Sequence, residues 1–235
     1  MGPRAGRLRD KFRGRFYELA ERPGLGASYR FETAAAGTYT LGASLFTIDT
    51  TFLSDSAFSE RGRTRVEDGG AGNTEALDSV AVTLDGEAIP ELESLPFNLG
   101  YRHLEAGAGG VADEEGYVAG VAQKFALNDD TTLGAVAEAA YFANFDGSSV
   151  DATSLTGGLF VRRGAWHGEV AATLRAFEED GAADVEDRLV QLSGGYEFAN
   201  GIDLSAGMAS VEEDDLDSTV FGLRITKAFT LAGAR

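Results

Sequence analysis

The chain has 235 residues, of which 38 are acidic, 20 are basic, 31 are glycine and none is cysteine, and its formal charge is −18. This excess of negative charge repels phosphate backbones, so nucleic-acid binding is not expected. The lack of cysteine excludes disulfides and thiol chemistry. No run of about 18 apolar residues is present to form a transmembrane helix, but a hydrophobic content of 43% favours a folded chain over a disordered one.

Residues 1–24 form a basic N-terminal segment without the apolar stretch of a secretory signal. Within it, KFRGRFYELA permits three interpretations. It is a first strand with Phe12, Gly14 and Phe16 on one face, or it is a short basic amphipathic helix, or the whole chain is the C-terminal part of a larger barrel whose early strands and signal lie upstream. Residues 25–235 are expected to form one domain.

Period-2 alternation dominates from Leu25 onward and predicts about eleven strands. They lie near residues 25–31, 38–49, 78–85, 95–104, 116–127, 131–145, 154–163, 166–175, 188–198, 202–210 and 220–231. In residues 188–198, for example, Val190, Leu192 and Tyr196 share one face, while Gln191 and Glu197 share the other. Glycine and alanine recur inside the segments, which suits strands that curve around a barrel.

The connections alternate between short and long, and the long ones carry acidic runs at residues 113–115, 178–180 and 212–217. This rhythm is typical of outer-membrane barrels, which have short periplasmic turns and longer extracellular loops. The acidic runs are therefore expected outside the cell. The glycine-rich DGGAGN at residues 68–73 is expected to be flexible.

Alternation also fits a soluble β-sandwich with an inward apolar face, but two features favour a membrane barrel. Charged residues in mid-strand suit a wet lumen, and aromatic residues near strand ends suit the girdles at the membrane interfaces. The aromatic residues are Tyr39, Phe97, Phe125, Phe145, Trp166, Tyr196, Phe198 and Phe229. The expected fold is all-β, a transmembrane antiparallel up-and-down β-barrel of about 12 strands, or the C-terminal part of a larger barrel.

From Leu25 to Leu231 the sequence resembles the Gram-negative outer-membrane porins. The resemblance is carried by glycine-rich amphipathic strands, acidic loops and a final strand, FGLRITKAF, that ends in Phe229. It implies a water-filled channel in the bacterial outer membrane for passive diffusion of small hydrophilic solutes or ions. It also implies contacts with outer-membrane lipid and lipopolysaccharide, insertion by the barrel-insertion machinery through the C-terminal strand, and possible oligomers. The alternative is a non-conducting structural or adhesive barrel whose acidic extracellular loops bind cations.

The predicted pore-lining residues are the polar residues of the strands that face away from the apolar side, because charged rings in a lumen set ion preference. They are Arg102, Lys124, Glu138, Arg162, His167, Glu169, Arg175, Gln191, Glu197 and Arg224, and the same reasoning adds Arg30 and Arg188. The alternative is that these charges pair across neighbouring strands and only keep the lumen hydrated.

Other chemistry has less support in the sequence. Carboxylates of Glu212, Asp214 and Asp215 are candidates for a weak divalent cation such as Ca²⁺, although a solvated, self-repelling loop explains the same run. No other cofactor is expected. His103 and His167 lie on separate strands with no serine motif near either, so no catalytic site is predicted; His167 is expected in the lumen and His103 at the membrane interface.

Overall fold

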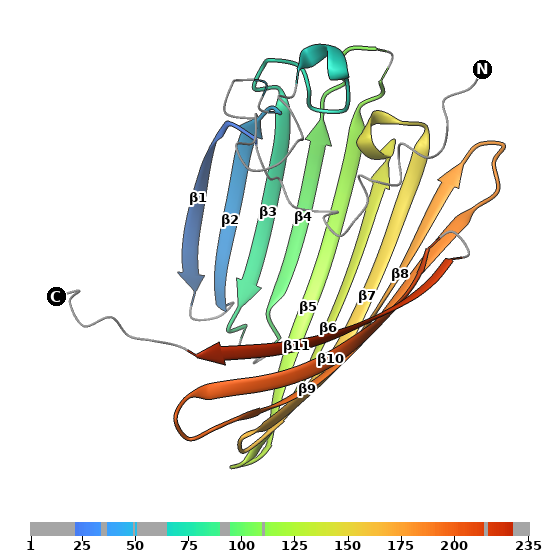
Figure 1. The fold of residues 1–235 in the computed structure, drawn as a ribbon. Helices are drawn as coiled ribbons and strands as arrows, with labels where there is room; N and C mark the ends of the chain where they lie inside the picture. The colour runs from blue at the N-terminus through green and yellow to red at the C-terminus, as the bar shows by residue number, and fades with distance from the viewer. Residues whose placement is uncertain are drawn as a thin grey trace.

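The computed structural model describes residues 22–33, 37–48, 50, 65–89, 95–109, 111–213 and 216–227. These residues form one sheet of eleven strands in chain order, and each strand is antiparallel to its neighbours (Figure 1). The strands are β1 (Gly24–Thr33), β2 (Gly37–Phe46), β3 (Ser79–Glu87), β4 (Phe97–Leu104), β5 (Glu114–Asn128), β6 (Thr131–Ala143), β7 (Val150–Arg163), β8 (Trp166–Glu179), β9 (Val185–Glu197), β10 (Ile202–Glu213) and β11 (Leu216–Lys227). Two 3₁₀ turns, η2 (Val66–Asp68) and η3 (Phe145–Gly147), lie in the connections.

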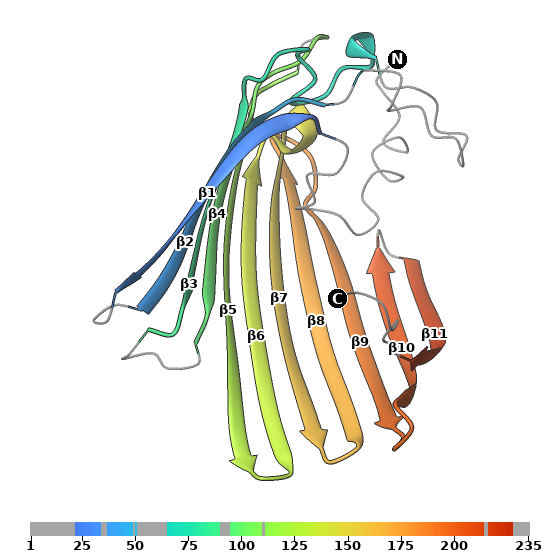
Figure 2. The same ribbon diagram turned by 90° about the vertical axis from the view of Figure 1, so that its left-hand side faces the viewer.

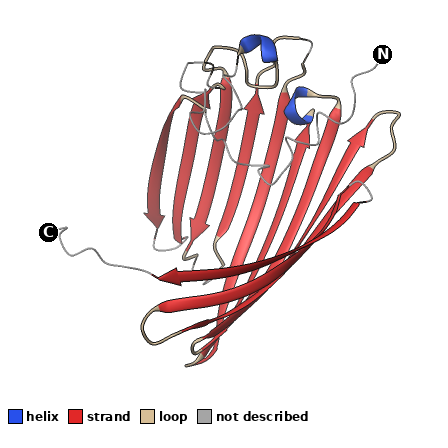
Figure 3. Ribbon diagram, viewed as in Figure 1, coloured by secondary structure: helices blue, strands red, loops and turns tan. Residues whose placement is uncertain are grey.

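The sheet is a curved wall that turns part of the way round a barrel, with β1 and β11 at its two edges (Figure 2). Figure 3 shows that strands make up most of the described chain. The predicted all-β, antiparallel up-and-down architecture is therefore confirmed. Among the described residues, no helix has the length and apolar character needed to cross a membrane. The KFRGRFYELA segment lies outside the residues that the structure describes.

Successive connections lie at opposite ends of the wall because every strand reverses direction. We call the end with the connections after β2, β4, β6, β8 and β10 the loop end, and the other end the turn end (Figure 2). At the turn end, β5 and β6 are joined by two residues, as are β7 and β8. Connection length does not fully separate the two ends, because residues 88–96 join β3 to β4 at the turn end, whereas only residues 214–215 lie between β10 and β11 at the loop end.

All eleven predicted strands are present, but several extend farther toward the loop end than the alternation predicted. β8 continues to Glu179, and β10 and β11 pair up to Glu213 and Leu216, so most of the acidic run at 212–217 lies in a hairpin rather than in a long loop. The physical reason is that alternation marks only the part of a strand with one apolar face. Where both faces meet water, the backbone ladder continues without that pattern.

The pairing register divides the side chains between two faces, because residues opposite each other in the ladder point to the same side. One row across β7 to β11 contains Leu159, Val170, Leu192, Met208 and Phe221. We call this side the apolar face. A row three residues along each strand, on the polar face, contains Arg162, His167, Gly195, Ser205 and Arg224.

Aromatic side chains on the apolar face form two belts. Toward the turn end, Phe31 stacks on Tyr39 with ring centroids 5.4 Å apart, and Trp166 meets Tyr196 at 4.8 Å. Toward the loop end, the Tyr101 and Tyr117 rings lie 5.4 Å apart. On β5, Tyr117 and Phe125 are eight residues apart, or about 27 Å along the strand. Strand tilt brings this spacing close to the apolar band of about 25 Å found in outer-membrane barrels.

The apolar face packs against nothing in the described structure. Leu192 is 54% exposed and Phe221 76%, whereas the buried apolar residues form only two small clusters near the loop end. A soluble sandwich would cover this face with a second sheet, so the described sheet is not half of such a core. Phe145, predicted as an interfacial aromatic, is buried beside Phe142 instead, because the η3 turn folds it back onto the sheet.

Candidate channel-lining face

The register places ten of the predicted pore-lining residues on the polar face. These are Arg102, Lys124, Glu138, Arg162, His167, Glu169, Arg175, Gln191, Glu197 and Arg224. They come from seven strands, β4 to β9 and β11. Arg30 lies on the same face, so the polar face carries both signs of charge across the wall.

Arg188 is the exception, and its prediction as a lumen residue is wrong. The ladder pairs it with Leu174 on the apolar face. It lies close to the loop end of β9, 3.6 Å from the Glu186 carboxylate and still exposed. Arg188 lies closer to the loop end than the row that contains Leu192, so its guanidinium can remain in water.

Near the turn end, several charges of the polar face pair across strands. Arg162 of β7 pairs with Glu197 of β9, and His167 Nε2 lies 2.6 Å from Asp203 Oδ2 of β10. Gly195 separates His167 from β10 in the ladder, and a Cβ there would lie 2.6 Å from His167 Nε2. The glycine therefore leaves the room that lets the imidazole cross β9. These contacts are cross-strand charge pairs of the kind that the sequence analysis gave as the alternative to open, pore-lining charges.

Other charges on the same face form no ion pair or hydrogen bond with another described residue. They are Lys124, Glu138, Glu169 and Arg224, and each is exposed or half-buried. Unpaired charges on one face act on passing ions more strongly than paired ones, because no partner cancels their field. The polar face thus contains charges that pair across strands and charges that pair with no other described residue.

At the loop end, Arg102 is not an open lining residue. Its Nε donates to Glu114 Oε1 at 2.7 Å, its guanidinium lies 4.3 Å from the Phe142 ring centroid, and it is only 5% exposed. The other carboxylate oxygen, Glu114 Oε2, accepts the backbone N–H of Asp146 at 2.8 Å. Sequence reasoning missed Glu114 as the partner, since strand alternation gives a face but not the register between β4 and β5.

The connection before β3 packs over this end of the polar face. The Asn73 amide donates to the carbonyls of Arg65 and Gly69 at 2.9 Å each, and Gly72 N–H donates to Glu105 O at 2.7 Å. Ala71 is buried with Phe46, Ala81 and Leu104. The DGGAGN segment, expected to be flexible, therefore has a defined structure because its glycines allow close backbone contacts.

A further cation lies beside this packed region. Burial lowers the pKa of the Arg22 guanidinium from its ordinary value, and the charge of Arg102 lowers it further, while Glu114 and Asp146 act in the opposite direction. The Arg22 guanidinium also lies 5.5 Å from the Phe46 ring centroid. The loop end of the polar face is thus packed and charged, whereas the paired charges near the turn end are half-buried or exposed.

The predicted divalent-cation site is only partly visible. Asp214 and Asp215 lie outside the described residues, and Glu212 is opposite Arg188 on one side and Asp217 on the other. The cation site in this hairpin stays a prediction.

The chain is similar in fold to solved porin structures. It matches a porin refined at 1.8 Å resolution with a TM-score of 0.52 and 17% identity, over 87% of this chain and 61% of that one. It also matches the NanC porin at a TM-score of 0.40 and 8% identity, over 88% of this chain and 98% of that one, a likeness too low to add to the argument. This chain thus spans about three fifths of the length of the first porin. No protein-family model and no curated protein matches it. The sheet of this chain therefore has the antiparallel, up-and-down architecture of a porin barrel wall.

Proposed function

We propose that the chain forms a water-filled channel in the bacterial outer membrane for passive diffusion of small hydrophilic solutes or ions. The observation that carries this proposal is the division of the sheet into an exposed apolar face with two aromatic belts and a polar face with charges of both signs. Lipid contact suits the first face, and an aqueous lumen suits the second.

Conductance tests the proposal directly. The full chain, refolded in detergent and added to a planar bilayer in symmetric salt, should give discrete conductance steps. A heat-modifiable, folded protein that produces no steps would contradict the channel and favour a closed structural or adhesive barrel.

The free charges of the polar face should set the ion preference of the channel. We expect Lys124→Glu combined with Arg224→Glu to shift the cation-to-anion permeability ratio by roughly twofold or more toward cations, because both residues lie on the polar face and neither forms an ion pair with another described residue. The reversal potential in asymmetric salt measures this shift. Lys124→Arg with Arg224→Lys is the matched control and should leave the potential unchanged; an equal potential in all three proteins would show that these residues do not line the conducting path.

The loop end should face the outside of the cell, because it carries the acidic connections. The chain has no cysteine, so Asp180→Cys at the loop end and Asp129→Cys at the turn end each introduce a single thiol. A maleimide on a polymer too bulky for a channel should label Asp180→Cys on intact cells, and Asp129→Cys only after the outer membrane is broken. The reverse result would invert the orientation.

A further inference from the structure

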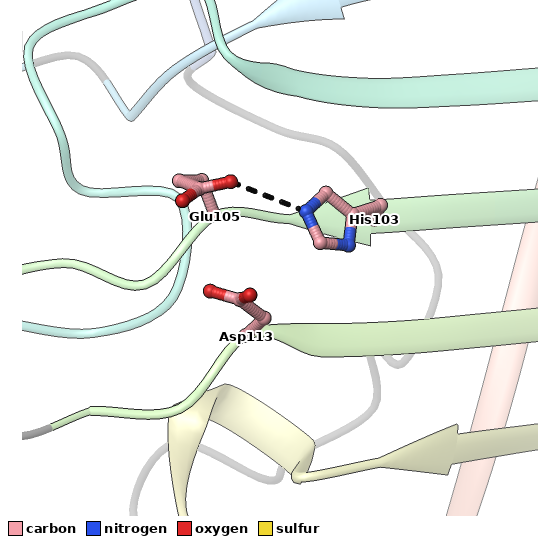
Figure 4. A group of neighbouring side chains, drawn as sticks. All are labelled: His103, Glu105 and Asp113. Carbon is pink, nitrogen blue, oxygen red and sulfur yellow. Dashed lines mark hydrogen bonds and ion pairs between the residues drawn. The ribbon is translucent and has the colours of Figure 1, made fainter.

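Three potential metal ligands meet at the loop end of the β4–β5 hairpin (Figure 4). His103 is next to last in β4, Glu105 directly follows the strand, and Asp113 directly precedes β5. One ligand atom from each lies within 4.8 Å of the other two. The three residues belong to one hairpin, so the backbone ladder already holds them together.

The two ring nitrogens of His103 both face carboxylates. Nδ1 lies 3.0 Å from Glu115 Oε1, and Nε2 lies 3.3 Å from Glu105 Oε2. A neutral imidazole carries one N–H and one bare lone pair, so it can donate to only one of them. With Nδ1–H donating across the shorter distance, the Nε2 lone pair of a neutral ring faces an oxygen lone pair, and a proton or a metal ion between the two atoms makes that contact favourable.

The separation of these two atoms is suited to a metal ion. Two ligand atoms about 2.0 Å from a tetrahedral Zn²⁺ lie roughly 3.3 Å apart, which matches the distance between Nε2 and Oε2. Hydrogen bonding of the second ring nitrogen to a carboxylate is also the usual arrangement at metal-bound histidines, since it fixes the tautomer and orients the ring. Glu115, the ladder partner of His103, fills this role.

The cluster also lacks a compensating cation. Glu105, Asp113 and Glu115 contribute three negative charges, and no lysine or arginine of the described chain forms an ion pair with any of them. The neighbouring Arg102 points to the opposite face, where Glu114 and Phe142 hold it. Among the described residues, the imidazole of His103 is thus the one group that could carry positive charge and that contacts Glu105 and Glu115.

Backbone contacts fix the third ligand. Asp113 Oδ1 accepts the N–H of Ala106 at 2.6 Å, and the Asn144 side chain donates to the Asp113 carbonyl at 3.0 Å. The second oxygen, Oδ2, receives neither of these bonds. Asp113 can therefore keep its position while it offers one oxygen to an ion.

We propose that His103 Nε2, Glu105 and Asp113 bind one Zn²⁺ or a similar borderline divalent ion, with Glu115 as the positioning residue behind the imidazole. An imidazole ligand favours Zn²⁺, Ni²⁺ or Co²⁺ over Ca²⁺ and Mg²⁺, which prefer oxygen alone. Because His103 lies on the apolar face, the ion would tie the β4–β5 hairpin together from outside the wall. The site is therefore independent of the channel.

Calorimetric titration of the refolded full chain in detergent with ZnCl₂ tests the proposal. We expect one Zn²⁺ per chain that excess Ca²⁺ does not displace, and with Co²⁺ the visible absorption of a nitrogen-ligated ion. His103→Ala should abolish this binding, and Glu115→Gln should weaken it by about 10- to 100-fold. Two controls, His167→Ala and Asp180→Asn, remove the other histidine and another loop-end carboxylate, and should keep the site.

Two results would overturn the proposal. Equal Zn²⁺ binding by His103→Ala and the unaltered chain would show adsorption to acidic loops. No stoichiometric binding by a chain with intact barrel content would show that the contacts of His103 with Glu105 and Glu115 hold no metal ion. Neither result depends on conductance, so failure of this site would leave the channel proposal as it stands.

Discussion

Leu192→Arg should sharply reduce folding into lipid vesicles. Leu192 lies near the middle of β9 on the apolar face, between Val170 and Met208 in the ladder. An arginine at the bilayer midplane costs about 2–4 kcal/mol, a roughly 30- to 700-fold lower folding equilibrium constant. The heat-modifiable band on gels and the fluorescence of Trp166, the one tryptophan of the chain, measure the folded fraction.

Gln191→Arg is the matched control, because it adds the same side chain one residue away. Gln191 lies on the polar face between Ala171 and Ala209, where water can hydrate the guanidinium. This variant should fold nearly as well as the unaltered chain. Equal folding losses for the two variants would contradict the assignment of the apolar face to lipid.

Arg102→Met should destabilise the loop end strongly. The substitution leaves the Glu114 carboxylate, 1% exposed, without its guanidinium partner. Removing one member of a buried ion pair costs about 3–5 kcal/mol, because the other charge remains buried and uncompensated. Urea unfolding from vesicles, followed by Trp166 fluorescence, would show the lower free energy of unfolding.

Two further variants separate this effect from the loss of a side chain alone. Adding Glu114→Gln to Arg102→Met removes the stranded charge and should recover a large part of the stability. Arg30→Met breaks an exposed pair with Glu87, whose side chains are 58% and 54% exposed, and should cost at most about 1 kcal/mol. Similar losses for Arg102→Met and Arg30→Met would show that the Arg102 pair is not buried in the folded protein.

The sequence predicted the strands and their faces well because both depend on a local period of two. Gln191 and Leu192 are assigned to opposite faces by alternation alone, and the ladder agrees. Arg188 shows the limit, since alternation from Leu192 already places it on the apolar side, whereas its charge suggested the lumen. Near a strand end, charge no longer distinguishes the faces because water reaches both.

Contacts between strands could not be predicted in the same way. The Arg102–Glu114 pair and the His103–Glu115 contact both depend on the register of β4 against β5, and a shift of one residue would break both. The packing of Asn73 and Ala71 depends on a connection that returns to the sheet, which no local pattern encodes. Local sequence thus predicts the face on which a side chain lies, but it does not predict which residue of the neighbouring strand or connection the side chain contacts.

The two edges of the wall have a consequence for how a barrel could close. With eleven strands in strict alternation, β1 and β11 point in the same direction, so joining them directly would make a parallel pair in an otherwise antiparallel wall. Each edge also presents a row of backbone N–H and C=O groups, and each unsatisfied group in hydrocarbon costs several kcal/mol. An all-antiparallel closure in the membrane therefore needs an odd number of additional strands between β11 and β1, whichever residues supply them. Stability in lipid then depends on that closure as much as on any contact within the eleven strands.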